Sequence, residues 1–134
     1  MNHHLTLTLL EGQFAICQLA PHQDIPPWAT RGEVWSVTRT PTELTVVCGE
    51  HYVPKDAPAD GGWGCLRIDG HFDLSMTGVL DSVAGPLANA GVSIFAFSTF
   101  ETDYLLIRST QIHVARATLT DAGHAVHIPE RNPR

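Results

Sequence analysis

The order of elements predicted for residues 63–128 limits the possible folds more than any other feature of the sequence. This stretch reads as a strand, a helix, two strands, a second helix and a final strand. Such an order allows two helices to bury one face of an antiparallel sheet. It therefore predicts a small two-layer α+β domain in the second half of the chain.

The two predicted helices each carry one apolar stripe. In the first, over residues 78–90, the stripe is Val79, Leu80, Val83, Leu87 and Ala88. Thr77 or Ser75 is expected to cap its start, and Gly91 to end it. Proline lacks an N–H and crowds the preceding turn, so Pro86 predicts a kink or a tightened turn near Gly85 within one helix, not two helices. In the second helix, which ends at Gly123, the stripe is Ile112, Ala115, Leu119 and Ala122.

Four strands complete the predicted second half. They are residues 65–70, 92–98, 104–108 and 125–128, with a turn at 100–103 between the second and third. The third of these strands is nearly all apolar, as expected for a central position in a sheet. Together with the helices, the strands predict a ferredoxin-like βαββαβ fold.

The first half of the chain predicts strands without a regular helix. Strand patterns occur at residues 5–9, 14–19, 34–38 and 44–48, with a short helical turn near residues 25–29. Residues 53–64 are rich in Pro, Gly and Asp and are expected to be irregular. We therefore predict a division into residues 1–62 and 63–134.

Composition excludes several classes of function. The chain has 134 residues, is 43% hydrophobic and carries a formal net charge of −6, which argues against binding nucleic acid. It has no apolar run long enough to span a membrane and no signal-peptide pattern at its start. Cys17, Cys48 and Cys65 are widely spaced and are expected to be buried, reduced thiols. We expect a soluble cytoplasmic protein.

No motif in the sequence indicates catalysis or metal binding. The eight histidines are scattered, and His124 and His127 are spaced to point to opposite faces of a strand. There is no Gly-x-Ser-x-Gly sequence, and Gly61-Gly62-Trp63-Gly64 lacks the lysine of a phosphate-binding loop. We therefore expect no enzyme activity, no cofactor and no metal.

Two consecutive segments resemble the ACT domain family. They are TGVLDSVAGPLANAG at residues 77–91 and VSIFAFSTFETDYLLI at residues 92–107. The resemblance covers residues 63–128 and is strongest to the tandem pairs related to aspartate-kinase regulatory regions and cytosolic arginine sensors. It implies that residues 1–62 are a degenerate ACT-like half that lacks its second helix.

The resemblance also implies a ligand site. In this subgroup two units lie side by side and bind amino acids through the loop into the first helix and through a strand–turn–strand. The corresponding positions here are Met76, Thr77, Gly78, Val79, Leu80, Ser98, Thr99, Phe100, Thr102 and Asp103.

These residue types suit an amino acid, although each has a simpler explanation. Free N–H groups at the start of a helix attract a carboxylate, and Gly78 lets a ligand approach the backbone. Asp103 can accept hydrogen bonds from an ammonium group. Thr77 and Gly78 are equally typical of helix capping, and Asp103 of an ordinary turn.

We therefore predict a non-catalytic regulatory protein that binds a small molecule, with an amino acid as the first candidate. We also expect it to self-associate, and a partner enzyme is a further possibility. The alternative is a protein–protein interaction scaffold with a vestigial pocket. A small enzyme acting on an amino-acid derivative is a third, weaker hypothesis.

Overall fold

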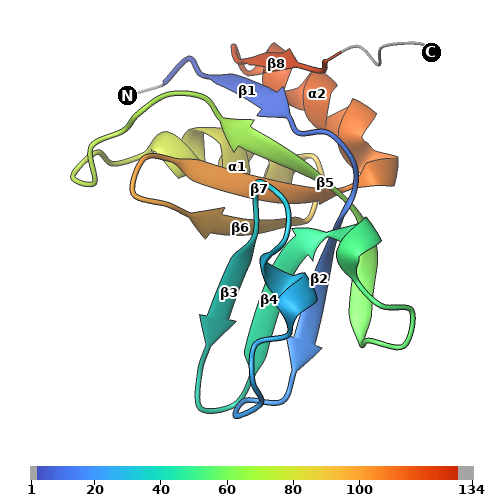
Figure 1. Cartoon of the computed structure of the whole chain (residues 1–134). Coiled ribbons are helices and arrows are strands. Elements are labelled where there is room, and N and C mark those ends of the chain that lie inside the picture. The colour runs from blue at the N-terminus through green and yellow to red at the C-terminus, as the bar shows by residue number, and fades with distance from the viewer. Residues whose placement is uncertain (1–2, 130–134) are drawn as a thin grey trace. The chain divides into compact units, whose positions relative to one another are not determined.

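The computed structural model of the chain describes residues 3–129 and contains two compact units (Figure 1). The β unit is Gly12–Trp63, and the α+β unit joins the residues before Gly12 to those from Gly64 onward. Strand β5, Ala59–Ile68, contributes residues to both. The described residues form eight strands and two α-helices.

The α+β unit has the predicted βαββαβ order from β5 onward. After β5 come α1 (Val79–Asn89), β6 (Ile94–Ser98), β7 (Asp103–Arg108), α2 (Ile112–Asp121) and β8 (Ala125–His127). A short 3₁₀ helix, Ser109–Gln111, leads into α2. The fold class predicted from the sequence is confirmed.

Strand β1, Thr6–Leu9, is an additional strand of this unit. It pairs antiparallel with β5 and parallel with β8, so the strand order is β8-β1-β5-β7-β6. The predicted division placed this strand with residues 1–62, because alternation along one strand does not reveal its partner. Its two neighbours instead place it in the α+β unit.

The core of the α+β unit lies between its sheet and both helices. Alternate residues of the strands, such as Leu7, Ile68 and Leu105, pack against the apolar stripes of α1 and α2. From the predicted stripes, Val83, Leu87, Ala115 and Leu119 are fully buried. In Figure 1 α1 lies behind β5 and β7, and α2 lies next to β1 and β8. The helical periodicity therefore identified the buried faces correctly.

Helix α1 runs as one helix through Pro86, as predicted. Because proline has no N–H, the carbonyl of Ser82 loses the helical donor that residue 86 would supply. The ring of His124 replaces that donor, with Nε2 2.8 Å from the Ser82 oxygen. Nδ1 of the same ring accepts the Leu5 N–H at 3.0 Å. This buried histidine therefore links the residue before β1, helix α1 and the turn before β8.

The β unit is an antiparallel sheet with strand order β3-β4-β2-β5. Its own strands are β2 (Phe14–Leu19), β3 (Ser36–Arg39) and β4 (Leu44–Gly49). Two 3₁₀ turns, Pro27–Thr30 and Glu50–Tyr52, are its helical elements. The first of these corresponds to the predicted helical turn.

The prediction that residues 53–64 are irregular was wrong for the last part of that stretch, because β5 begins at Ala59. Ala59 and Asp60 pair with β2, and the register then shifts between the Ile16–Asp60 and Phe14–Trp63 pairs. This bulge accommodates the positive φ of Gly62, whose N–H donates to Glu50 Oε1 at 2.7 Å. Pairing with a neighbouring strand thus outweighed the local preference of two glycines for a turn.

The three cysteines are free and buried, as expected. Cys17 and Cys48 belong to the core of the β unit, where the two thiols are hydrogen-bonded to each other. That hydrogen bond and burial raise the pKa of Cys48, and burial raises the pKa of Cys65 to about 12. Neither of the two described α-helices is long and apolar enough to cross a membrane.

Candidate functional site

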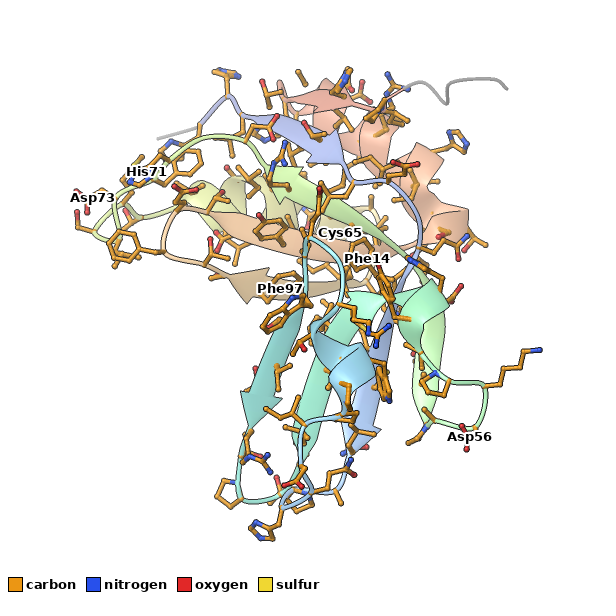
Figure 2. The ribbon with its side chains drawn as sticks, viewed as in Figure 1. Phe14, Asp56, Cys65, His71, Asp73 and Phe97 are labelled. Atoms are coloured by element: carbon orange, nitrogen blue, oxygen red, sulfur yellow. The ribbon has the colours of Figure 1, made fainter. Side chains whose placement is uncertain are left out.

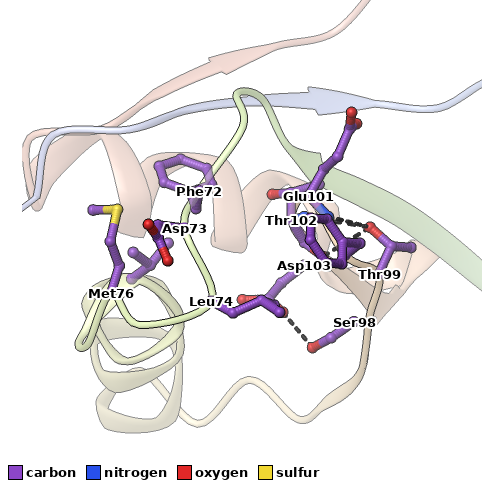
Figure 3. A pocket seen from close by; sticks show the side chains of 11 residues that line it. Phe72, Asp73, Leu74, Met76, Ser98, Thr99, Glu101, Thr102 and Asp103 are labelled. Atoms are coloured by element: carbon purple, nitrogen blue, oxygen red, sulfur yellow. Dashed lines mark hydrogen bonds between the residues drawn. The ribbon is translucent and has the colours of Figure 1, made fainter.

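A cavity of about 190 Å³ lies between the loop that precedes α1 and the turn that joins β6 to β7 (Figure 3). Its lining residues are Phe72, Asp73, Leu74, Met76, Val79, Ser98, Thr99, Phe100, Glu101, Thr102 and Asp103. Seven of these are among the ten site residues predicted from the sequence: Met76, Val79, Ser98, Thr99, Phe100, Thr102 and Asp103.

The other three predicted residues lie elsewhere. Thr77 and Gly78 line an adjacent cavity of about 570 Å³, which shares Met76 with the first. Leu80 packs against the core of the α+β unit. The structure therefore brings most of the predicted residues to one cavity, and it places the partly buried Leu80 against the core.

Hydrogen bonds of two threonines hold the β6–β7 turn. The Thr99 N–H donates to the Thr102 carbonyl at 2.8 Å. The Thr99 hydroxyl donates to that carbonyl and accepts the N–H groups of Glu101 and Thr102. The hydroxyl of the buried Thr102 donates to the Ile68 carbonyl at 2.6 Å. The two hydroxyls thus give their protons to backbone carbonyls, which fits a role in shaping the cavity wall.

Asp103 differs from these threonines because it retains capacity to accept. It is half-buried at the start of β7, opposite Ser98 in the β6–β7 ladder. One carboxylate oxygen, Oδ1, accepts the Ser98 hydroxyl (dashed in Figure 3). A carboxylate offers about four acceptor positions, so Asp103 can accept further hydrogen bonds at the cavity.

The loop before α1 is ordered by Asp73. Its Oδ1 accepts both the N–H and the hydroxyl of Ser75 at 3.0 Å, and these bonds lower the pKa of the Asp73 carboxyl. The Phe72 N–H donates to the Glu101 carbonyl at 2.8 Å and so connects this loop to the opposite turn. Figure 2 shows His71 and Asp73 on this loop.

The start of α1 is not capped by a side chain, contrary to the expectation for Thr77 or Ser75. The Ser75 hydroxyl is bonded to Asp73, and Gly78 occupies the N-cap position with φ of +80°. A Cβ at Gly78 would approach only the His3 ring, at 3.7 Å, so the positive φ is what favours glycine here. The first N–H groups of the helix remain available to an acceptor.

Sequence reasoning missed Phe72, Asp73, Leu74 and Glu101 as lining residues. The available signal was the alternation of the apolar residues Phe72, Leu74 and Met76 with polar ones, in a segment that forms a loop and not a strand. Leu74 and Phe100 are 70% and 72% exposed. The cavity thus combines carboxylates with exposed apolar side chains.

The charged lining residues are all acidic: Asp73, Glu101 and Asp103. Glu101 lies 3.4 Å from the His71 ring nitrogen. Across residues 3–129, no group of three or more His, Cys, Asp or Glu side chains is placed to hold a metal ion. Such a set of carboxylates attracts a positive group and repels a negative one.

Comparisons with known proteins agree with this fold. A family model described as an ACT domain matches residues 59–121, and a second, described as an N-terminal domain, matches residues 12–56. Human CASTOR3P is 31% identical over 104 residues, which are 68% of this chain and 64% of that protein. The human cytosolic arginine sensor for mTORC1 subunit 1 is 29% identical over 104 residues. The match covers 69% of this chain but only 32% of the sensor, so the chain spans about a third of that sensor's length.

Solved structures show the same architecture. Protein Atu0741 from Agobacterium tumefaciens superposes with a TM-score of 0.92 at 36% identity, over 98% of both chains. The ligand-free regulatory subunit of aspartate kinase from Thermus thermophilus has a TM-score of 0.60 at 13% identity, over 87% of this chain and 95% of that one. The first family model confirms the resemblance found in residues 77–107, and residues 59–121 of this chain are a domain of the ACT family.

Proposed function

We propose that this protein is a non-catalytic regulator that binds an amino acid in the cavity between the α1 loop and the β6–β7 turn. One observation carries the proposal. Seven of the ten predicted residues, which come from two separate segments of the sequence, line one cavity. The positions were chosen from sequence resemblance, and their grouping around one cavity supports the proposal.

The chemistry of the cavity suits a zwitterion. Asp103 provides a negative acceptor for the ammonium group, through charge-assisted hydrogen bonds. The uncapped start of α1, where Val79 lines the cavity, provides N–H groups and a positive dipole end for the carboxylate. The lining also includes the apolar side chains of Phe72, Leu74, Met76 and Phe100.

The comparisons support a regulatory role. The relatives include a cytosolic arginine sensor, and a structural neighbour is a regulatory subunit of aspartate kinase. We propose that ligand binding favours one packing of two copies over another, in proportion to its differential affinity for the two states. A cytoplasmic location and action on a partner enzyme are part of the same proposal.

Thermal unfolding against the twenty amino acids tests this function. A ligand at 100 times its Kd adds about 2.7 kcal/mol to the free energy of unfolding, which raises the melting temperature by several degrees. Asp103→Asn should remove the shift, whereas Asp121→Asn, an exposed carboxylate at the end of α2, should leave it unchanged. A shift that survives Asp103→Asn would contradict the assigned site.

An interaction scaffold is the second candidate, and the exposed Leu74 and Phe100 side chains favour it. On this hypothesis they contact another protein and no metabolite enters the cavity. The scaffold would be supported over the sensor if no amino acid raised the melting temperature and if copies of the chain associated less strongly after Leu74→Ser.

A further inference from the structure

Exposed apolar side chains are concentrated at the candidate site. Among the described residues, six large apolar side chains are exposed: Ile25, Trp35, Leu74, Met76, Phe100 and Val114. Three of them, Leu74, Met76 and Phe100, line the same cavity. Single exposed apolar residues are ordinary, but a group of them around a cavity marks a binding site.

Hydrogen-bonded turns present these apolar side chains. Leu74 lies within the turn closed by Asp73 and Ser75, and Phe100 within the turn closed by Thr99 and Thr102. The Phe72–Glu101 backbone bond joins the two segments. The backbone that carries these apolar groups is therefore held in place around the cavity, which lowers the entropy cost of binding.

The size and charge of the cavity restrict the range of ligands that would fit it. Its volume of about 190 Å³ is below the range of about 300–1,000 Å³ typical for drug-sized ligands, which favours a single amino acid over a nucleotide. Among residues 3–129, no Lys or Arg side chain lines it, so a second acidic group on the ligand would meet only carboxylates there. Of the three lining carboxylates, Asp73 and Glu101 are exposed to solvent and Asp103 is half-buried, so Asp103 is the carboxylate best placed to bind one positive group of the ligand.

We propose that the ligand is an α-amino acid with a large uncharged apolar side chain, such as leucine, methionine or phenylalanine. Its ammonium group binds Asp103, and its side chain packs against Leu74, Phe100 and the half-buried Phe72. This inference rests on the proposed function and specifies the chemical class that the site takes.

The test is isothermal titration calorimetry on the full chain with leucine, methionine, phenylalanine, arginine, lysine, glutamate and serine, each added separately. The three apolar amino acids should bind, and glutamate and serine should not. Leu74→Ser and Phe100→Ser should each raise the Kd about tenfold, because each removes an apolar contact. Val114→Ser is the matched control: Val114 is 49% exposed on α2 and does not line the cavity.

The outcomes separate this inference from the proposed function. Binding of arginine, lysine or serine in place of the apolar amino acids would overturn the ligand class while preserving the regulatory function. Binding of none of the seven, with an intact fold and a flat thermal panel, would overturn both. If leucine binds and neither Leu74→Ser nor Phe100→Ser changes its Kd, the assignment of the apolar lining would be overturned.

Discussion

His124 should be one of the most stabilising polar residues of the α+β unit. It is 5% exposed, and its ring bonds the Leu5 N–H and the Ser82 carbonyl at the same time. The second bond exists because Pro86 cannot donate to Ser82. Removing the ring therefore leaves one donor and one acceptor of the backbone unsatisfied.

The magnitude follows from these contacts. Each unsatisfied buried group costs about 1–3 kcal/mol, and solvent entry would relieve part of that cost. We expect His124→Ala to lower the free energy of unfolding by about 2–4 kcal/mol. At about 4 °C per kcal/mol, the melting temperature should fall by roughly 8–16 °C. His127→Ala, at an exposed position of β8, should change the free energy of unfolding by less than about 0.5 kcal/mol.

A double-mutant cycle with Pro86→Ala tests the reasoning. Alanine at position 86 supplies the N–H that the Ser82 carbonyl lacks, so His124→Ala should cost about 1 kcal/mol less in that background. Urea denaturation of the four proteins gives the coupling energy. If His124→Ala lowers the free energy of unfolding equally with Pro86 and with Ala at position 86, His124 does not replace the missing helical donor. If His124→Ala and His127→Ala lower it equally, the buried ring has no special importance.

Three further predictions concern single groups. Thr102→Val should lower the free energy of unfolding by about 1–2 kcal/mol, because the Ile68 carbonyl loses its buried donor. Urea denaturation measures this loss, and an unchanged unfolding midpoint would contradict the prediction. The Asp73 carboxyl should titrate below its ordinary pKa in NMR, because the N–H and hydroxyl of Ser75 stabilise its charged form. The charged Asp73 contributes to the free energy of unfolding above its unfolded pKa, and this contribution is lost as pH falls through the folded pKa. Ser75→Ala removes the hydroxyl bond and should return the pKa of Asp73 toward its ordinary value. The buried Cys65, with its pKa raised to about 12, should resist thiol reagents in the native state, and stability should fall as pH rises past the ordinary thiol pKa; rapid native labelling would argue against this burial.

Local periodicity determined much of the α+β unit. The buried stripes of α1 and α2 follow from apolar residues at helical spacing, and Gly91 and Gly123 end their helices with positive φ, as predicted. The prediction of βαββαβ order was correct because each element carries its own pattern of apolar residues. The seven lining residues that resemblance located lie close to two such elements, the start of α1 and the β6–β7 turn.

The tertiary structure decided which segments meet. Leu7 alternates with threonines as any half-buried strand does, and only pairing with β5 and β8 assigns β1 to the α+β unit. The bulge at Gly62 depends on β2, and the role of His124 depends on a proline 38 positions earlier in the sequence. Leu74 and Phe100 are likewise brought to one cavity by a backbone bond between distant segments. Such partners lie far apart in the chain, and local propensity carries no information about them.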